Sequence, residues 1–561
     1  MFLSRSKFNE VTYSSLNHCA FMFRKPFDDE NKSHLLFNTL NNFNVGLRCF
    51  CNWVNHMKLS KIFIIMFCST VSSCSNSDTV MAPYEKKLEL DGTTTRSFHS
   101  MLYYPSGIAL HSPGYIIGVE KSPIRIIGGP NEIKPIAKNN RKSMFISHII
   151  KNDFNVINGN SSTPYITSSY CFVYNSYISE ELVGKSNIDL AKINGWDACK
   201  ISSSIEDAKH AELRSFYKNS DVGITALKSN LKHDLKSGAY SHILIIVMGW
   251  NTSQSDAIRN FNDITGNIIT ASLEQQDDVK ENPSSSTSNM LIPRVRVIKS
   301  SEKNNLHFRP LVIGITWPSY WSTRLDNVAS YPNKANDADE LGLIWLNKII
   351  NQTIPESISE SGIKLPVIAI GHSFGARAMT RALFSSPLIK NDTTVSSPVD
   401  LAVSLQGAMS INRFFPGLSE EGAPYRDYMR LGNTKLVLTA SKFDSAVKFA
   451  KWTDPAGAVK SYVKACTQPV YSGTFHCMTA SDTSATEKKG KFSLCNRGDT
   501  SEKCANPLND INGARVIDYI DTSNGITQFN SFGTGGDAHS DIYRLPMGRL
   551  LWRLIQAYAM K

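Results

Sequence analysis

The pattern of apolar and polar positions changes near residue 221 of this 561-residue chain. Beyond that point, short runs rich in β-branched residues alternate with segments of helical spacing, which is typical of a parallel sheet covered by helices. The run Ile243–Val247 (ILIIV) is hydrophobic throughout and predicts a strand buried on both faces. Further strands are predicted at Leu311–Thr316, Leu365–Ile370, Leu401–Leu405, Leu436–Thr439 and Ala514–Ile520.

Segments between these strands carry helical patterns. They lie at Asp256–Ile268, Ala338–Ile350, Ala376–Phe384 and Met547–Tyr558. Residues 221–561 are therefore expected to form an α/β domain on a mostly parallel, doubly wound sheet. Within it, Glu281–Asn289 (ENPSSSTSN) predicts a flexible loop, and residues 450–512, which are polar and hold four cysteines, predict an insertion that acts as a cap or surface excursion.

Residues 97–220 have a different pattern. Their short apolar runs are broken by Pro and Gly, at Met101–Tyr104, Tyr115–Val119, Ile124–Ile127 and Cys171–Tyr177. This pattern predicts a smaller β-rich N-terminal region in front of the α/β domain, to which the sequence assigns no chemistry.

The apolar run Ile62–Phe67 has the flanks of an export signal. Lys58 and Lys61 precede it, and small residues follow it as far as Cys74. The run is much shorter than the ~20 residues that a membrane-spanning helix needs. The ending Val71–Cys74 (VSSC) resembles a bacterial lipobox, which predicts cleavage before Cys74 and lipidation of its thiol. The alternative is that Ile62–Phe67 is an ordinary buried strand.

The export interpretation divides the start of the chain into three parts. Because a signal has to begin a chain, residues 1–56 are interpreted as an upstream extension that is not native. Residues 57–73 are then the signal peptide and 74–96 a polar tether. The expected location is the bacterial cell envelope, with the protein attached to a membrane through lipidated Cys74.

The motif with chemistry is Gly371-His372-Ser373-Phe374-Gly375. It follows a predicted strand and precedes a helix rich in small residues. In that context G-x-S-x-G is typical of a sharp turn that exposes a serine nucleophile, here Ser373. Gly371 and Gly375 would remove side chains that collide with the neighbouring strand and helix.

With this motif and the strand order around it, residues from about 241 to 561 resemble the α/β-hydrolase superfamily of esterases and lipases. The resemblance implies a catalytic triad in the chain order nucleophile, acid, histidine. His476 and His539 are the histidines that follow Ser373. His539 is the expected base, because it lies in a glycine-rich loop after the last predicted strand, whereas His476 lies in the insertion.

The acid and the oxyanion hole follow from the same resemblance. Asp444 comes after the strand predicted at Leu436–Thr439, where the family carries its acid, and Asp454 stays open as an alternative. The oxyanion donors would be the backbone N–H groups of Phe374 and Trp250. Met248 stands where many members have histidine, so the rigidity of this loop is in question.

Together these residues imply hydrolysis of a carboxylic ester, or of a lipid ester near the membrane, through an acyl-enzyme intermediate, and amide and peptide substrates stay open as alternatives. An apolar pocket and ordinary core packing are equally good interpretations of five aromatic residues near the strand ends. They are Trp250, Trp317, Tyr320, Trp321 and Phe374. A catalytically silent protein of the same fold, binding an envelope partner, is the alternative function.

Composition narrows these possibilities. A chain with 41% hydrophobic and 19% charged residues is globular. The net charge of +11 is not gathered into a dense Lys/Arg run, so no nucleic-acid partner is expected. No motif implies a metal or an organic cofactor. After cleavage at Cys74 an even set of cysteines remains, with local pairing expected for Cys171 with Cys199 and, among themselves, Cys466, Cys477, Cys495 and Cys504.

Overall fold

The computed structural model describes residues 110–560 apart from several gaps. The gaps are 122–124, 129–131, 136–143, 158–164, 176–196, 199–215, 253, 281–307, 320–330, 391–393, 420, 433, 445, 447–453, 483–491, 500–506, 510–515 and 526–537. The expectations for the leader, the signal peptide, the tether, Cys74, Tyr320 and Trp321 fall outside the described residues. Apart from residues 331–333, the described residues belong to one structural unit, formed by residues 88–322 and 334–561.

Twelve strands in the described part of the chain form one sheet. In order across it they are β13 (Phe492–Asn496), β12 (Phe475–Asp482), β14 (Ile517–Asp521), β11 (Lys435–Ala440), β10 (Leu401–Leu405), β9 (Val367–His372), β7 (His242–Val247), β8 (Pro310–Thr316), β1 (Gly114–Lys121), β4 (Met144–Ile157), β5 (Tyr165–Asn175) and β6 (Asp197–Ala198). All neighbours from β12 to β1 pair in parallel. The expectation of an α/β fold on a mostly parallel sheet is confirmed.

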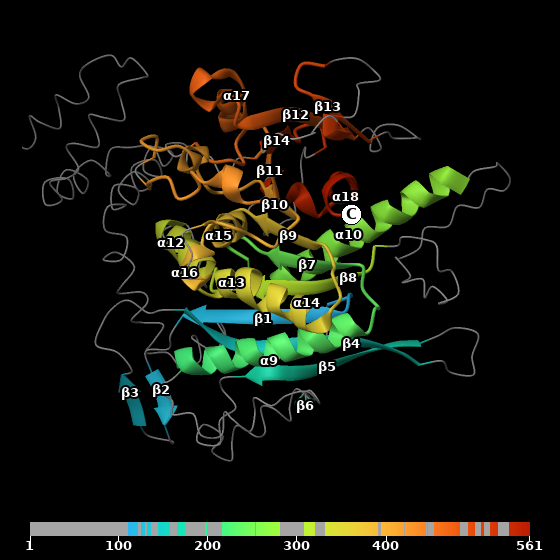
Figure 1. The fold of residues 1–561 in the computed structure, drawn as a ribbon, viewed down its shortest axis with the longest axis vertical. Coiled ribbons are helices and arrows are strands. Elements are labelled where there is room, and N and C mark those ends of the chain that lie inside the picture. The colour runs from blue at the N-terminus through green and yellow to red at the C-terminus, as the bar shows by residue number, and fades with distance from the viewer. Residues whose placement is uncertain are drawn as a thin grey trace, which may run out of the picture. The chain divides into compact units, whose positions relative to one another are not determined.

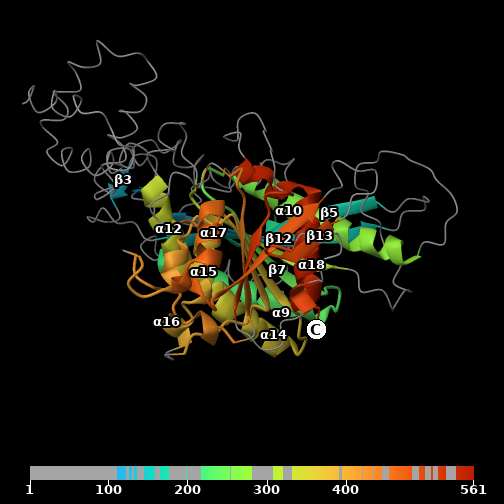
Figure 2. The same ribbon diagram turned by 90° about the horizontal axis from the view of Figure 1, so that it is seen from above.

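Helices lie on both sides of this sheet (Figures 1 and 2). One side carries α10 (Gln254–Lys280) and α18 (Leu545–Tyr558), which contact each other. The other carries α9 (Phe216–Lys236), α13 (Trp345–Lys348), α14 (Ile354–Ser361) and α15 (Phe374–Leu383). The remaining elements are α12 (Tyr331–Leu343), a π-helical turn η4 (Ile349–Thr353), α16 (Pro387–Lys390), α17 (Val459–Thr467), the hairpin of β2 (Arg125–Gly128) and β3 (Glu132–Pro135), and the 3₁₀ turns η5 (Ile411–Phe414), η6 (Tyr428–Arg430), η8 (Pro469–Tyr471), η9 (Pro507–Asn509) and η10 (Ala538–Tyr543).

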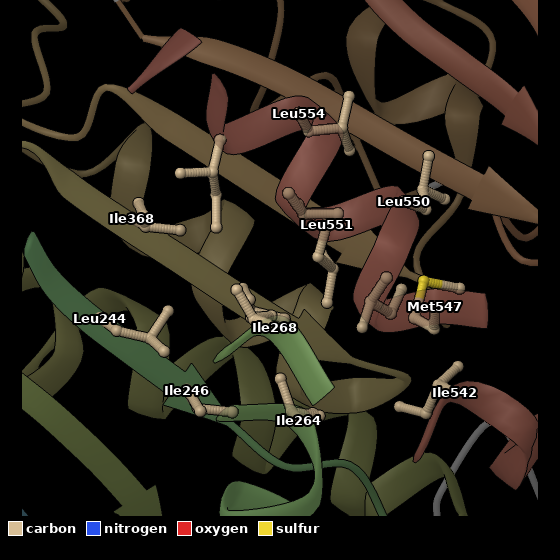
Figure 3. Close-up of a cluster of buried hydrophobic side chains, with 14 of the residues drawn as sticks. Leu244, Ile246, Ile264, Ile268, Ile368, Ile542, Met547, Leu550, Leu551 and Leu554 are labelled. Carbon is tan, nitrogen blue, oxygen red and sulfur yellow. The ribbon is translucent and has the colours of Figure 1, made fainter. Parts of the chain in front are cut away.

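The main hydrophobic core lies between the sheet and the α10/α18 pair (Figure 3). Leu244 and Ile246 of β7 point into it, and so do Leu551 and Leu554 of α18. All six residues of β7 are buried, because the alternate positions of the strand are covered by the helices on the opposite side. The unbroken apolar pattern of this strand is the consequence of two covered faces.

The chain changes direction across the sheet at β7. From β7 it crosses to β8 on one side, and the next strands β9, β10 and β11 follow one another on the other side. In doubly wound sheets the crevice for a ligand lies at the carboxyl ends of the strands at such a point. The carboxyl ends of β7 and β9 are therefore where this fold favours a site.

Two predicted regions differ from the structure in their organisation. Most of the N-terminal strands belong to the main sheet, since β1 pairs in parallel with β8 and β4 and β5 extend the same sheet, while β2 and β3 form a separate two-stranded sheet. The cysteine-bearing segment 450–512 also joins the sheet, where β12 pairs in parallel with β14. The physical reason is burial: Ile116 of β1 and Met478 of β12 both pack into the α10/α18 core.

One helix prediction also needs correction. The helical pattern at 338–350 does not form one continuous helix, because α12 ends at Leu343 and a short helix starts at Trp345. The backbone then widens into the π-helical turn η4 before α14 begins at Ile354. The apolar spacing indicates which residues are buried, but local pattern does not show where the helical winding changes.

Candidate active site

Ser373 occupies the turn between β9 and α15 with a backbone φ of +55°. This left-handed conformation is costly for a residue other than glycine and occurs at functional turns. A Cβ on Gly371 would lie 2.5 Å from Cα of Ala376, and one on Gly375 would lie 2.1 Å from the carbonyl oxygen of Val247. Gly371 is thus required for α15 to follow β9 so closely, and Gly375 is required for α15 to pack against the end of the neighbouring strand β7.

The loop after β7 lies directly against this serine. A Cβ on Gly249 would be 2.6 Å from Cβ and 3.3 Å from Oγ of Ser373, so only glycine allows this approach. The next residue is Trp250, whose ring centroid is 6.4 Å from that of Phe374. The two residues expected to supply oxyanion donors therefore both lie next to Ser373, one in the loop after β7 and one at the start of α15.

The loop after β7 is held by hydrogen bonds from outside it, although Met248 stands in place of the expected histidine. The indole N–H of Trp317 donates to the carbonyl oxygen of Met248 at 2.7 Å, and the backbone N–H of Asn251 donates to that of Ser319 at 3.0 Å. Trp317 is buried with 7% of its surface exposed, so it acts as a brace rather than a pocket wall. The buried Lys334 in turn donates to the carbonyl oxygen of Pro318.

His539 and Asp444 are brought together at the same edge of the sheet. Nδ1 of His539 lies 2.8 Å from a carboxylate oxygen of Asp444, whose side chain is fully buried. The other oxygen of Asp444 accepts from the backbone N–H of Ala446 at 3.1 Å. Asp444 follows β11 and His539 lies in η10, before α18, as the chain order of the triad requires.

The alternative residues make other contacts. Asp454 pairs with Lys464 at 2.5 Å and accepts from the side-chain amide of Asn412 at 3.0 Å. His476 lies at the start of β12, where Nδ1 is 3.3 Å from Asp518 and Nε2 is 2.9 Å from the side-chain oxygen of Asn496. Because β12 and β14 are parallel, this position is at the amino ends of the strands, away from Ser373.

His372 connects the serine turn to His539. The two imidazole rings have centroids 4.5 Å apart, and Nε2 of His372 lies 2.9 Å from the backbone carbonyl oxygen of His539. Sequence reasoning treated His372 only as a variable position of the motif. No local signal distinguishes it, because its partner is 167 residues further along the chain.

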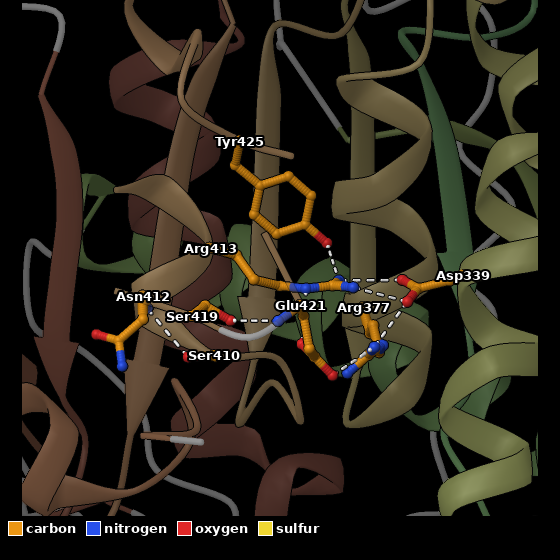
Figure 4. A network of polar contacts seen from close by, with 8 residues as sticks. All are labelled: Asp339, Arg377, Ser410, Asn412, Arg413, Ser419, Glu421 and Tyr425. Carbon is orange, nitrogen blue, oxygen red and sulfur yellow. Dashed lines mark hydrogen bonds and ion pairs between the residues drawn. The ribbon is translucent and has the colours of Figure 1, made fainter. Parts of the chain in front are cut away.

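The helix behind the serine is held by an ionic network whose two arginines are buried (Figure 4). Arg377 of α15 and Arg413 of η5 both bind the Asp339 carboxylate, at 2.6 and 2.7 Å, and both contact Glu421. Arg413 also donates to the hydroxyl of Tyr425 at 2.8 Å. Burial opposes ionisation of Asp339, but the two guanidinium groups hold the pKa of its carboxyl below the usual value.

Cysteine pairing is visible in part. Cys466 at the end of α17 is bonded to Cys477 of β12, in accord with pairing among the four later cysteines. Cys171 and Cys495 each take part in a disulfide bond as well. Cys199 and Cys504 fall outside the described residues.

No family model, curated protein or solved structure matches this chain. Among the described helices, none is long and apolar enough to cross a membrane. In the same part of the chain, no group of three or more His, Cys, Asp or Glu side chains is arranged to hold a metal ion.

Proposed function

We propose that this protein is a serine hydrolase of the α/β-hydrolase superfamily, anchored to the bacterial envelope membrane, that cleaves carboxylic esters. The observation that carries the proposal is the buried Asp444–His539 pair next to the strained turn of Ser373. These residues lie at the carboxyl ends of β9 and β11 and in η10, beside the point where the strand order reverses. A buried acid–histidine pair, a serine held at a positive φ and their common place at the carboxyl ends of the strands together match what a nucleophilic serine requires.

In the proposed reaction, His539 takes the proton of the Ser373 hydroxyl through Nε2 as Oγ attacks the ester carbonyl carbon. The carbonyl oxygen becomes an oxyanion that the backbone N–H groups of Phe374 and Trp250 stabilise. Collapse of this intermediate expels the alcohol, which receives the proton from His539, and leaves an acyl group on Ser373. A water molecule deprotonated by His539 then releases the carboxylic acid and restores the serine.

Asp444 has a separate task in this scheme. Its carboxylate accepts from Nδ1–H of His539, which leaves Nε2 of the neutral imidazole free of a proton and able to act as the base. When His539 becomes positively charged, the same buried carboxylate stabilises the imidazolium. Burial away from water strengthens the attraction between the Asp444 carboxylate and the imidazolium of His539.

The substrate class is supported by chemistry around the serine. Trp250, which is only partly buried and follows the glycine that contacts Ser373, favours an apolar acyl group over a charged one, whereas Phe374 is buried and supports the Trp250 ring. Attachment to a membrane through Cys74 would bring such a site close to lipid esters. The lipid anchor is tested separately: a Cys74→Ser variant is expected to lose incorporation of labelled fatty acid and to leave the membrane fraction.

Hydrolysis of p-nitrophenyl esters of increasing acyl length tests the proposal. We expect turnover by the wild type with a pre-steady-state burst of p-nitrophenol, and no burst from Ser373→Ala at equal concentration and equal thermal stability. If wild type and Ser373→Ala release p-nitrophenol at the same rate, the protein does not use Ser373. The catalytically silent, partner-binding alternative would then replace the enzyme proposal.

A further inference from the structure

The turn η10 that carries His539 is not held in place by its own backbone. It spans only Ala538–Tyr543, and short 3₁₀ turns have weak internal hydrogen bonds. A catalytic imidazole has to stay within a few tenths of an ångström of its working position. The contacts that fix the turn must therefore come from other elements of the fold.

Three backbone carbonyl oxygens of η10 accept hydrogen bonds from side chains elsewhere. Nε2 of His372, at the end of β9, lies 2.9 Å from the oxygen of His539. Nε2 of Gln406, just after β10, lies 3.3 Å from the oxygen of Ala538. The amide of Asn267 in α10 donates to the oxygen of Tyr543 at 2.7 Å. The turn is thus fixed along its length from two strand ends and one helix.

His372 is suited to this task and unsuited to acid–base work. Burial and the neighbouring His539 lower the pKa of His372 well below the ordinary value, so its imidazole is neutral. Its single N–H is at Nε2 and donates to His539, and Nδ1 accepts from the hydroxyl of Tyr543 at 3.3 Å. Both ring nitrogens therefore contact the turn that carries the base.

Gln406 shows signs of a second constrained position. It is fully buried, and its backbone φ is +45°, a strained conformation for a residue with a side chain. Its backbone N–H donates to the hydroxyl of Thr439 at 3.0 Å, which fixes the residue to β11. This arrangement directs the side-chain amide to Ala538, the residue before His539.

We propose that His372 and Gln406 are positioning residues that hold the backbone of the His539 turn against the serine turn. Because His372 precedes Ser373 directly, movement of the nucleophile and of the base is coupled through one side chain. This inference rests on the proposed function, since it concerns the base of the same reaction. It assigns no proton transfer to either residue.

The chain offers a matched control for His372. His242, at the start of β7, is equally buried, and its Nε2 lies 2.9 Å from the backbone carbonyl oxygen of Ala559. The two histidines make the same kind of bond on adjacent parallel strands, but His242 does so at the opposite edge of the sheet. His242→Phe and His372→Phe should therefore lower stability to a similar extent.

The experiment measures covalent labelling of the full chain by a fluorophosphonate probe, with the maximal labelling rate separated from the probe affinity. We expect His372→Phe to reduce the maximal rate by at least tenfold with little change in affinity, and His242→Phe to leave both unchanged. His372→Gln, which retains a donor near the Nε2 position, should recover part of the rate.

Gln406→Met supplies a second test in case His372→Phe does not fold. It retains the size of the side chain and removes the donor, and we again expect a lower maximal rate at unchanged probe affinity. Wild-type rates in both His372→Phe and Gln406→Met would overturn the positioning role while leaving the proposed function intact. Equal losses of the maximal labelling rate in His372→Phe and His242→Phe would also overturn the positioning role. Absence of labelling in the wild type would instead contradict the proposed function.

Discussion

Asp444 and His539 are 95 residues apart in the chain, yet the carboxylate of Asp444 accepts a hydrogen bond from Nδ1 of His539 at 2.8 Å. The carboxylate is fully buried, and its second oxygen is bound by the backbone N–H of Ala446. A buried charge of this kind is costly unless it is paired. The pairing of an acid with a histidine beside a strained serine is the relationship on which the functional account depends.

Replacing Asp444 by Asn should abolish most of the activity. The amide oxygen of Asn is expected to keep accepting from the backbone N–H of Ala446, which turns the NH2 group toward Nδ1 of His539. Because an NH2 group donates, it stabilises the wrong tautomer of His539, so we expect kcat for p-nitrophenyl ester hydrolysis to fall by about 10⁴-fold. Asp454→Asn is the control, because Asp454 pairs with Lys464 rather than with His539. A larger loss of kcat in Asp454→Asn than in Asp444→Asn would show that the acid has been assigned to the wrong residue.

Gly249→Ala tests the close approach of the oxyanion loop to the serine. The added methyl group would lie 2.6 Å from Cβ of Ser373, so the loop must move and the N–H of Trp250 would lose its position. Loss of one oxyanion donor costs about 2.7–4 kcal/mol of transition-state stabilisation, or about 10²–10³ in kcat.

The control for this variant is Gly266→Ala in α10. Gly266 is exposed and a Cβ there would meet nothing within 4 Å, so stability should rise by up to about 1 kcal/mol with kcat unchanged. Unaltered ester hydrolysis by Gly249→Ala at wild-type stability would mean that the loop after β7 takes no part in the reaction.

Stability should fall as the pH is lowered from about 7 to 5. Burial lowers the pKa of His148 to about 3, so the folded protein does not bind the proton that His148 takes up in the unfolded chain below about pH 6.5. This residue alone should remove about 1.4 kcal/mol of unfolding free energy per pH unit below that point. His242 and His372, whose pKa values are also lowered, act in the same direction.

Urea unfolding across this pH range measures the effect. His476 opposes it, because its bond to Asp518 raises its pKa and its contribution is lost as the pH rises through the folded value. The variant His148→Phe keeps a ring against Gly118 and removes one proton site, so its stability should depend less steeply on pH. If the unfolding free energies of wild type and His148→Phe depend equally steeply on pH, the lowered pKa of His148 is not a source of the pH dependence.

Asp339→Asn should destabilise the helix that follows the serine. The substitution leaves Arg377 and Arg413 buried with Glu421 as their shared carboxylate, and we expect a loss of about 3 kcal/mol in the free energy of unfolding. Glu360→Gln removes an exposed carboxylate from the surface pairs with Lys228 and Lys232 and should change stability little. Comparable urea midpoints for the two variants would contradict a stabilising role for the network.

Much of the central sheet could be predicted because its strands are covered on both faces. Such strands carry unbroken apolar runs, as at β7 and β10, and these runs can be read from the local pattern. The serine turn was also predictable, because the G-x-S-x-G spacing between a strand and a helix is a local pattern, although only Gly371 is required by contacts within a few residues of Ser373 and Gly375 is required by Val247 of the neighbouring strand. The resemblance to α/β-hydrolases, together with the position of Asp444 after β11, pointed to the residue that the fold brings to His539, with Asp454 open as an alternative.

Other features depend on long-range contacts that local pattern does not contain. The pairing of β1 with β8 joins segments almost 200 residues apart, so the N-terminal strands could not be assigned to the main sheet. The sequence does not show whether Trp317 lines a pocket, because its indole N–H donates to the backbone carbonyl oxygen of Met248, 69 residues earlier in the chain. The roles inferred for His372 and Gln406 follow from bonds to a turn that lies more than 130 residues away.

The central claim is that Ser373 is a nucleophile activated by His539. The most direct measurement is peptide mass spectrometry of the full chain after reaction with a fluorophosphonate probe, with wild type, Ser373→Ala and His539→Ala compared at equal fold stability. The account predicts one phosphonate adduct, on the peptide that contains Ser373, in the wild type, with no adduct in Ser373→Ala and at most slow labelling in His539→Ala. An unlabelled wild type, or an adduct at the same rate on another residue in Ser373→Ala, would contradict it.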